Sequence, residues 1–144
     1  STLMNDVFFH KVIPTDIQIV SLYKLLDQRK HIISHKNKPS FAEHQDFVCS
    51  NPYRAWYILE RNSKQFGTIY ISNENTIGIN FSTSTDYKFL EEILSYVKAN
   101  YSPLPEIKSI RGATFVINVS PKNKPLITAL EILESKVVQI SYSI

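Results

Sequence analysis

Residues 76–101 constrain the fold more than any other part of this chain of 144 residues. They read as an apolar strand over residues 76–81, a polar hinge over residues 82–86 and then a long amphipathic helix. Apolar residues recur in the helix at the spacing of one buried face: Leu90, Ile93, Leu94, Val97 and Tyr101. Such a hinge directs the free N–H groups of the helix, and the positive end of its dipole, beyond the strand. In many α/β proteins a phosphate group occupies that position.

Two features of this stretch leave its role open. The hinge lacks the glycines that usually let a phosphate approach the backbone. Ser84 or Thr85 can cap the helix by accepting a hydrogen bond from a free N–H group, and the same hydroxyls suit a phosphate. Gly78, within the strand, indicates either a β-bulge or a close approach of another group to the backbone.

The remaining segments alternate between strands and helices. Further strands are predicted over residues 7–12, 55–60, 66–72, 113–119 and 137–144. Further helices are predicted over residues 15–30, 40–49 and 123–134. The first of these helices should turn Ile17, Val20 and Tyr23 toward the core, with Leu26 as a further candidate for that face. The second begins with a capping box, in which Ser40 and Glu43 satisfy each other's N–H groups.

A helical crossover links the strand at residues 76–81 to the strand at residues 113–119. Such crossovers are right-handed and place the two strands side by side and parallel. Residues 113–119 are nearly all apolar, which is typical of a central strand covered on both faces. The sequence therefore predicts a mixed sheet in which antiparallel hairpins are followed by a parallel pair.

Composition narrows the class of protein. A hydrophobic fraction of 43% suits one globular domain over residues 1–144. There is no apolar run near 18 residues, so we expect no membrane span. The single cysteine, Cys49, forms no internal disulfide, which favours a reducing, cytoplasmic setting. The net charge of +3 comes from scattered basic residues, so we expect no nucleic-acid partner. The sequence has no His/Cys set at metal-ligand spacing, and we expect no metal.

The order of elements and three groups of residues resemble the GNAT family of N-acetyltransferases. Residues 33–44 and 52–57 look like the acceptor-side region of one bacterial branch of that family. Residues 67–70, which run into residues 77–79, look like its hairpin and fourth strand. Residues 110–112 and 115–123 look like its fifth strand and the turn that follows. The likeness covers nearly the whole chain.

This resemblance implies a single GNAT-like acyl-CoA-binding domain over residues 1–144, with an α+β (mixed α/β) fold. Its central sheet would be mixed and mostly antiparallel, with six to seven strands and about four flanking helices. A parallel pair in the middle of the sheet would splay apart, and acetyl-CoA would lie in the gap. The activity implied is direct transfer of the acetyl group to a primary amine of a small molecule or peptide.

The resemblance also assigns residues to that site. Main-chain groups at Ile79, Asn80 and Phe81 would polarise the thioester carbonyl. The coenzyme would also meet the hinge and the start of the last helix, at Ser84, Thr85, Asp86, Tyr87 and Asn123. Candidate catalytic and acceptor-pocket residues are His35, Asn118, Tyr53, Trp56 and Tyr57.

Each of these side chains has a second interpretation. His35 is more simply a solvated loop residue beside lysines. Asn118 could face a cleft or satisfy a buried backbone group. Asn123 is most simply a helix cap. Tyr53, Trp56 and Tyr57 could belong to the core of a strand instead of a pocket.

Two departures from the family pattern support an alternative function. Where the family has a glycine-rich loop, this chain has residues 82–88 without a glycine, and Asp86 adds negative charge there. Where the family often has a tyrosine that protonates the leaving thiolate, this chain has Leu130. The alternative is a non-catalytic GNAT-like domain that recognises a ligand or protein. In either case the strand at residues 137–144 could pair with a second copy to form a homodimer.

Overall fold

The computed structural model describes residues 2–4, 6–27 and 38–144. In these residues six strands form one sheet in the order β1-β2-β3-β4-β5-β6. The strands are β1 (Thr2–Met4), β2 (Val7–Lys11), β3 (Ala55–Arg61), β4 (Lys64–Ile71), β5 (Thr76–Phe81) and β6 (Val116–Ile117). The helices are α1 (Asp16–Asp27), α2 (Phe41–Ser50), α3 (Leu90–Asn100) and α4 (Lys124–Ile132), and a 3-10 helix (Ser84–Phe89) precedes α3. All strand pairs are antiparallel except β5 and β6, which are parallel.

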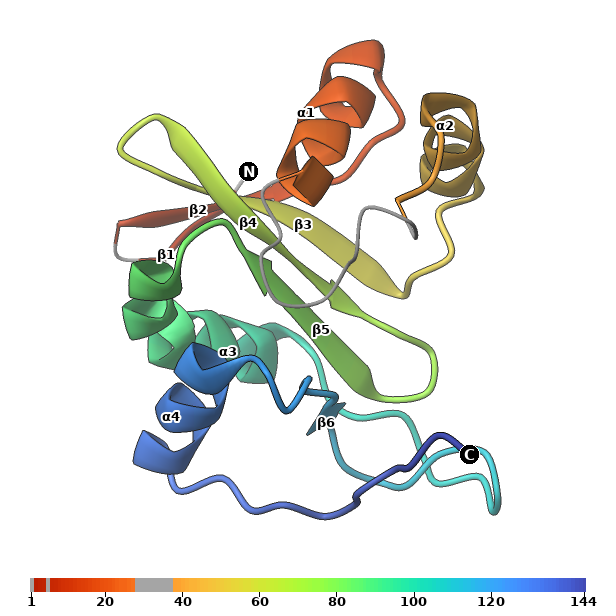
Figure 1. Ribbon diagram of the computed structural model, residues 1–144, viewed down its shortest axis with the longest axis vertical. Coiled ribbons are helices and arrows are strands. Elements are labelled where there is room, and N and C mark those ends of the chain that lie inside the picture. Colours follow the sequence, from red (N-terminus) through yellow and green to blue (C-terminus); the bar gives the residue numbers. More distant parts are fainter. Residues whose placement is uncertain (1, 5, 28–37) are drawn as a thin grey trace.

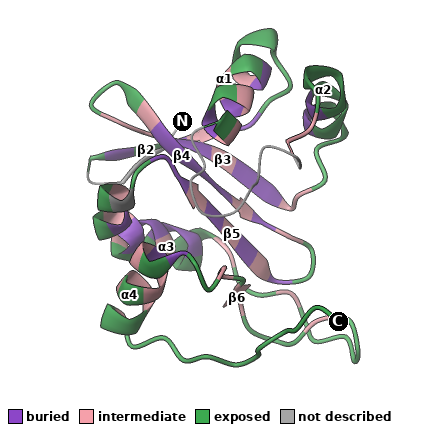
Figure 2. Cartoon of the chain, viewed as in Figure 1, coloured by how far each residue is buried: buried purple, intermediate pink, exposed green. Residues whose placement is uncertain are grey.

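The sheet is covered by helices on both faces, with α1 and α2 on one side and α3 and α4 on the other (Figure 1). Side chains alternate between the faces along β3, because successive Cβ atoms of a strand point to opposite sides. Trp56 and Ile58 join the core beneath α1 and α2. Ala55 and Leu59 join the larger core beneath α3 and α4. The centre of the sheet is therefore buried on both faces (Figure 2).

The three-strand meander forms as predicted from its local signals. Asn62 and Ser63 connect β3 to β4 with φ angles of 52° and 61°, the left-handed conformation that two-residue hairpins need. The capping box of α2 is also present: Ser40 Oγ accepts from the Glu43 N–H at 3.1 Å, and Glu43 Oε1 accepts from the Ser40 N–H at 3.0 Å.

Asn75 joins the start of β5 to a distant loop. Its side chain is fully buried, donates to the carbonyls of Leu104 and Gly112 at 2.9 and 2.8 Å, and accepts from the Leu104 N–H at 2.8 Å. Its main-chain carbonyl accepts from the Val116 N–H at 2.9 Å. This one residue therefore fixes where β6 meets β5.

The predicted buried face of α1 is wrong. Ile19, Leu22 and Leu25 are buried, whereas Ile17 and Val20 are 80% and 41% exposed. The helix has two rows of apolar residues at the same helical spacing. The row that contains Ile19, Leu22 and Leu25 packs against the sheet and α2, and the predicted row faces outward.

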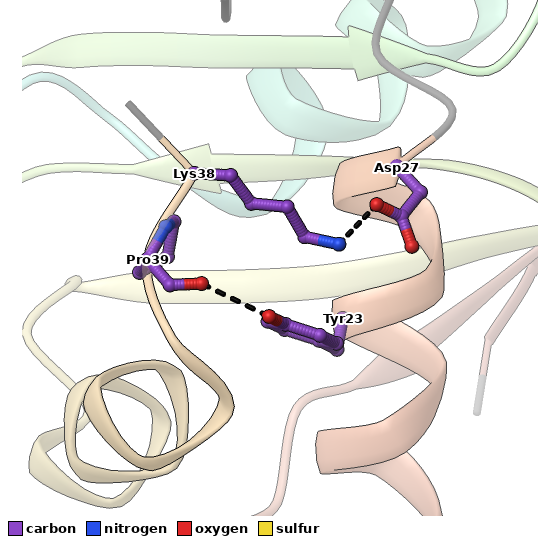
Figure 3. A network of polar contacts seen from close by, with 4 residues as sticks. All are labelled: Tyr23, Asp27, Lys38 and Pro39. Carbon is purple, nitrogen blue, oxygen red and sulfur yellow. Dashed lines mark hydrogen bonds and ion pairs between the residues drawn. The ribbon is translucent and has the colours of Figure 1, made fainter. Parts of the chain in front are cut away.

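Tyr23 lies at the junction of α1 and the segment before α2 (Figure 3). Its hydroxyl donates to the Pro39 carbonyl at 3.0 Å, and its ring lies 4.2 Å from Lys38 Nζ. Lys38 also pairs with Asp27. This network ties the end of α1 to the segment that leads into α2.

The predicted buried face of α3 is largely confirmed. Leu90, Ile93 and Val97 are buried, together with Tyr96, which the prediction omitted. Leu94 and Tyr101 are half-buried. The α-helix begins later than predicted, at Leu90, because the 3-10 helix intervenes.

The predicted strand at residues 137–144 does not form, and its apolar side chains are exposed, with Val137 and Ile140 at 82% and 70%. The sheet of the described residues has six strands, but they are not the six that the sequence predicted: β1 takes the place of the missing last strand, and β6 has two residues where seven were expected. Among the residues with described structure no strand lies beyond β6, so the parallel pair is at the edge of the sheet instead of its middle. An isolated edge position explains why β6 is short, because hydrogen bonds on only one side support it. No helix in the part of the chain described here is long and apolar enough to cross a membrane.

Candidate functional site

A cleft of about 620 Å³ lies between α1 and α2 on one side and β3, β4 and β5 on the other. Its helical wall is formed by Leu22, Leu25, Leu26, Pro39, Glu43, His44 and Phe47. Its sheet wall is formed by Tyr53, Trp56, Gly67, Thr68, Tyr70, Gly78, Ile79, Asn80, Ser82 and Asn118. This volume lies within the range typical of small-molecule sites.

The parallel strands part at the border of this cleft. β5 and β6 pair only at Thr76 with Val116 and at Ile77 with Ile117. β5 continues for four more residues to its end at Phe81, all without a β6 partner. Beyond Ile77 the edge of β5 is therefore not covered by β6.

The free edge carries main-chain donors. The Ser82 N–H donates to the Phe66 carbonyl of β4 at 2.7 Å, which shows that residue 82 faces β4. Main-chain groups alternate in direction along a strand, so Ile79 and Phe81 direct theirs to the opposite edge. If β5 and β6 continued as a regular parallel pair, the Ile79 N–H would donate the next hydrogen bond to the Asn118 carbonyl. The pairing ends before that hydrogen bond. The Ile79 N–H therefore points past the end of β6.

The side chains of β5 divide between the two faces. Ile79 and Phe81 belong to the core beneath α3, and Phe81 packs its ring against Tyr87 with centroids 4.8 Å apart. Asn80 is half-buried and lines the cleft. Asn118, immediately after β6, is exposed and also lines the cleft, which agrees with the first of its two interpretations.

A group of aromatic side chains lines part of the cleft. Tyr53 stacks on Tyr70 with centroids 3.9 Å apart, and it meets Trp56 edge-on at 5.0 Å. Phe47 of α2 meets Tyr53 and Trp56 edge-on at 5.8 and 5.9 Å. Tyr53 and Trp56 therefore both line the cleft and pack in the smaller core, and their assignment to an acceptor pocket stays a prediction.

Tyr57 does not belong to this group and is a correction to the prediction. It lies on the opposite face of β3, where its ring meets Phe9 and Tyr96 edge-on and its hydroxyl contacts the Tyr101 hydroxyl. The cause is the two-residue period of the strand, which sends neighbours to opposite faces. Burial, assisted by the hydrogen bond to Tyr101, raises the pKa of Tyr57, so its phenol stays protonated at neutral pH.

Two polar side chains lie on the helical wall. His44 is buried, and its Nε2 lies 2.9 Å from the Ile19 carbonyl. Because a carbonyl only accepts, Nε2 carries the proton and joins α2 to α1, which agrees with a structural role. Glu43 is exposed, and the Ser40 N–H and hydroxyl lower the pKa of its carboxyl. Glu43 is therefore ionised at neutral pH.

The hinge after β5 is a 3-10 turn whose groups satisfy one another. Thr83, not Ser84 or Thr85, is the cap residue, and its side chain makes no capping bond. Instead Thr83 Oγ1 donates to Asp86 Oδ2 at 2.8 Å and lies 2.9 Å from Thr85 Oγ1. The Asp86 N–H is directed to the Thr83 carbonyl at 3.3 Å. The predicted side-chain cap by Thr85 is therefore not formed, and the Asp86 donor is already engaged.

Tyr87 and Asn123 are buried behind the hinge. Asn123 Nδ2 donates to the Tyr87 hydroxyl at 3.0 Å, and Asn123 Oδ1 accepts from the Leu126 N–H at 3.3 Å. Asn123 therefore caps α4, as its simpler interpretation predicts. His35, the other candidate catalytic residue, lies outside the described residues.

Sequence reasoning does not identify several residues of the cleft, chiefly Tyr70, Thr68 and the apolar residues of α1. For Tyr70, the pairing partner in the neighbouring strand indicates its position. Tyr70 pairs with Gly78 across β4 and β5, and a glycine opposite an aromatic residue indicates that the ring lies over it. No group of three or more His, Cys, Asp or Glu residues able to hold a metal occurs among the residues with described positions.

Comparison with known proteins identifies the fold. No protein-family model matches this sequence, and no curated protein sequence matches it significantly. Among solved structures, it is similar to the crystal structure of a possible acetyltransferase from Clostridium difficile 630. The two share 10% of their residues, the match covers 96% of each chain, and the TM-score is 0.58. The chain thus has the fold of that possible acetyltransferase, which supports the GNAT-like fold implied by its sequence.

Proposed function

We propose that the protein is an acetyltransferase that transfers the acetyl group of acetyl-CoA to a primary amine held in the cleft. The observation that carries this proposal is the parting of β5 from β6 beside a cleft of suitable size. The thioester arm of acetyl-CoA carries amide groups, and the uncovered edge of β5 offers main-chain partners for them. A reducing, cytoplasmic setting fits a chain with one exposed cysteine.

The reaction would proceed by direct attack. The amine nitrogen forms a bond to the thioester carbonyl carbon, and the carbonyl oxygen gains negative charge. The Ile79 N–H, which points past the end of β6, would stabilise that oxyanion; one such donor is worth about 3 kcal/mol in the transition state. The ammonium group of the acceptor gives one proton to solvent before the attack, because only the neutral amine has a free lone pair. The C–S bond then breaks, the nitrogen loses a second proton, and the thiolate of coenzyme A takes up a proton and leaves as the free thiol.

The two ends of the coenzyme fit this chain unequally. The thioester arm meets a free strand edge with Asn80 and Asn118 beside it. The diphosphate would meet a 3-10 turn whose Asp86 carboxylate repels it and whose Asp86 N–H is engaged by Thr83. We therefore expect the strand edge to supply most of the affinity.

The hinge also favours one alternative, a non-catalytic GNAT-like domain that uses the cleft to recognise a ligand. The specific observation is that Thr83, Thr85 and Asp86 bond to one another, which leaves fewer groups for a diphosphate. Such a domain would bind an amine or peptide in the cleft without binding acetyl-CoA.

Titration with acetyl-CoA, followed by amide NMR, separates the two functions. For the acetyltransferase, the amide signals of Ile79 and Phe81 should shift on addition of acetyl-CoA. Those of Gly78 and Asn80, which face β4, should shift less and serve as internal controls. Release of free thiol with a panel of primary amines then measures turnover. Absence of any binding at millimolar acetyl-CoA would rule out the acetyltransferase in favour of the alternative.

A further inference from the structure

The chemistry of the cleft wall limits the amines that it can accept. Among the described lining residues, Glu43 is the only carboxylate, and no lysine or arginine is present. Lys38, which directly precedes the lining residue Pro39, is engaged by Asp27 and by the Tyr23 ring instead. The described part of the lining therefore offers an ammonium group one carboxylate and offers an anionic acceptor no lysine or arginine.

The polar and apolar groups of the cleft are separated in space. Asn80 lies in β5, Ser82 directly follows β5, and Asn118 directly follows β6. The helical wall opposite is apolar except at Glu43 and His44, and His44 already uses its Nε2 on Ile19. A sugar would leave many of its hydroxyl groups without partners against such a wall, which costs free energy.

Aromatic side chains from both walls give the cleft its specificity. Phe47, Tyr53, Trp56 and Tyr70 contact one another and present a continuous aromatic surface next to Leu22, Leu25 and Leu26. Aromatic faces also attract cations. A flat or branched apolar body can bury its surface here while its ammonium group lies near the carboxylate.

We infer that the acceptor is a cationic monoamine with an aryl or bulky alkyl body, rather than an amino sugar, a free amino acid or a polycation. The acetylation of this amine rests on the proposed function, whereas the selectivity of the cleft for amines can be measured without acetyl-CoA.

Trp56 supplies a direct readout, because it is the only tryptophan of the chain and lines the cleft. Titrations followed by its fluorescence should give a dissociation constant for 2-phenylethylamine at least tenfold lower than that for phenylalanine, which adds a carboxylate. The same difference is expected relative to glucosamine. The uncharged 2-phenylethanol should bind several-fold more weakly than the amine. Equal or tighter binding of phenylalanine or glucosamine would overturn the inference, as would the absence of any response to 2-phenylethylamine.

Two phenylalanines of α2 give a matched pair of variants. Phe47 and Phe41 are 45% and 42% exposed, but only Phe47 lines the cleft. Phe47→Ala should weaken 2-phenylethylamine binding about three- to tenfold, while Phe41→Ala should leave it unchanged. Glu43→Gln should remove most of the preference for the amine over 2-phenylethanol. Equal effects of the two phenylalanine variants would contradict the assigned wall.

Acetylation assays distinguish failure of this inference from failure of the proposed function. If 2-phenylethylamine binds selectively but acetyl-CoA does not bind, the acceptor class stands and the acetyltransferase function is lost. If the protein acetylates glucosamine or amino acids in preference to 2-phenylethylamine, the function stands and the acceptor class is wrong.

Discussion

Tyr70 lies directly over Gly78, across the β4–β5 pair. A Cβ atom at position 78 would lie 1.9 Å from Tyr70 Cε2 and 2.1 Å from its Cζ, distances that no side chain can adopt. Tyr70 also stacks on Tyr53, so its ring cannot move without disturbing the wall of the cleft. The glycine thus allows an aromatic ring to lie flat on the strand that borders the proposed thioester site.

Substitution of Gly78 by alanine should therefore both destabilise the protein and reshape the cleft. We expect a loss of about 1–3 kcal/mol in the free energy of unfolding, because the added methyl group must displace the Tyr70 ring. Chemical denaturation measures the loss. Gly112→Ala is the matched control, since a Cβ atom there meets nothing within 4 Å. Equal stability of the two variants would show that the ring does not occupy this position.

Asn75 should be among the most sensitive polar positions of the fold. Asn75→Ala removes three hydrogen bonds to Leu104 and Gly112 and leaves buried main-chain groups unpaired. We expect a loss of about 2–4 kcal/mol in the free energy of unfolding. Asn62→Ala controls for backbone strain. Asn62 has a positive φ of 52°, as Asn75 also has a positive φ, but Asn62 is exposed in a hairpin. A loss at Asn75 no larger than that at Asn62 would contradict the role of its side chain.

The parts of the fold that the sequence predicts correctly are those set by neighbours along the chain. Asn62 and Ser63 adopt the turn that β3 and β4 require, and Ser40 and Glu43 form their capping box within four residues. Turn and cap energies depend on local groups, so they can be inferred without knowing the tertiary structure.

The sequence does not predict which of the two faces of a strand or helix the rest of the protein covers. Both faces of β3 are buried, so alternation alone cannot tell that Trp56 faces the cleft and Tyr57 faces α3. The same ambiguity explains the wrong face of α1, where Ile17 and Val20 repeat at the spacing of Ile19 and Leu22. Residues 137–144 have the pattern of a strand, but a strand also needs a partner edge, and the sequence does not supply that information.

The capping box makes a specific contribution to the pH dependence of stability. The Ser40 N–H and hydroxyl lower the pKa of Glu43 from its usual 4.5, so the folded state favours the ionised carboxyl. This contribution is present above the unfolded pKa and is lost as pH falls through the lower folded pKa. The difference in melting temperature between wild type and Glu43→Gln should therefore be larger at pH 7 than at pH 3. Glu131→Gln, at an exposed position of α4, is the control; a difference for Glu43→Gln that does not change with pH would contradict the assignment.

The Asp86 carboxylate should be the main obstacle to tight coenzyme binding. Asp86→Asn keeps an oxygen that can accept from Thr83 Oγ1 and removes the negative charge at the hinge. A unit charge about 4 Å from a phosphate oxygen contributes about 1 kcal/mol in water, so acetyl-CoA should bind roughly fivefold more tightly to the variant. The gain should shrink as salt is raised, because dissolved ions screen the charge of the partly exposed Asp86 carboxylate.

The same variant tests which end of the coenzyme the hinge meets. S-acetylpantetheine has no diphosphate, so Asp86→Asn should leave its affinity unchanged while raising that of acetyl-CoA. Asp46→Asn makes the same change of charge at an exposed position of α2 that does not line the cleft, and it should affect neither ligand. Calorimetric titration of both ligands against both variants measures the four affinities. An equal gain for the two ligands, or for the two variants, would show that the diphosphate does not lie at this hinge.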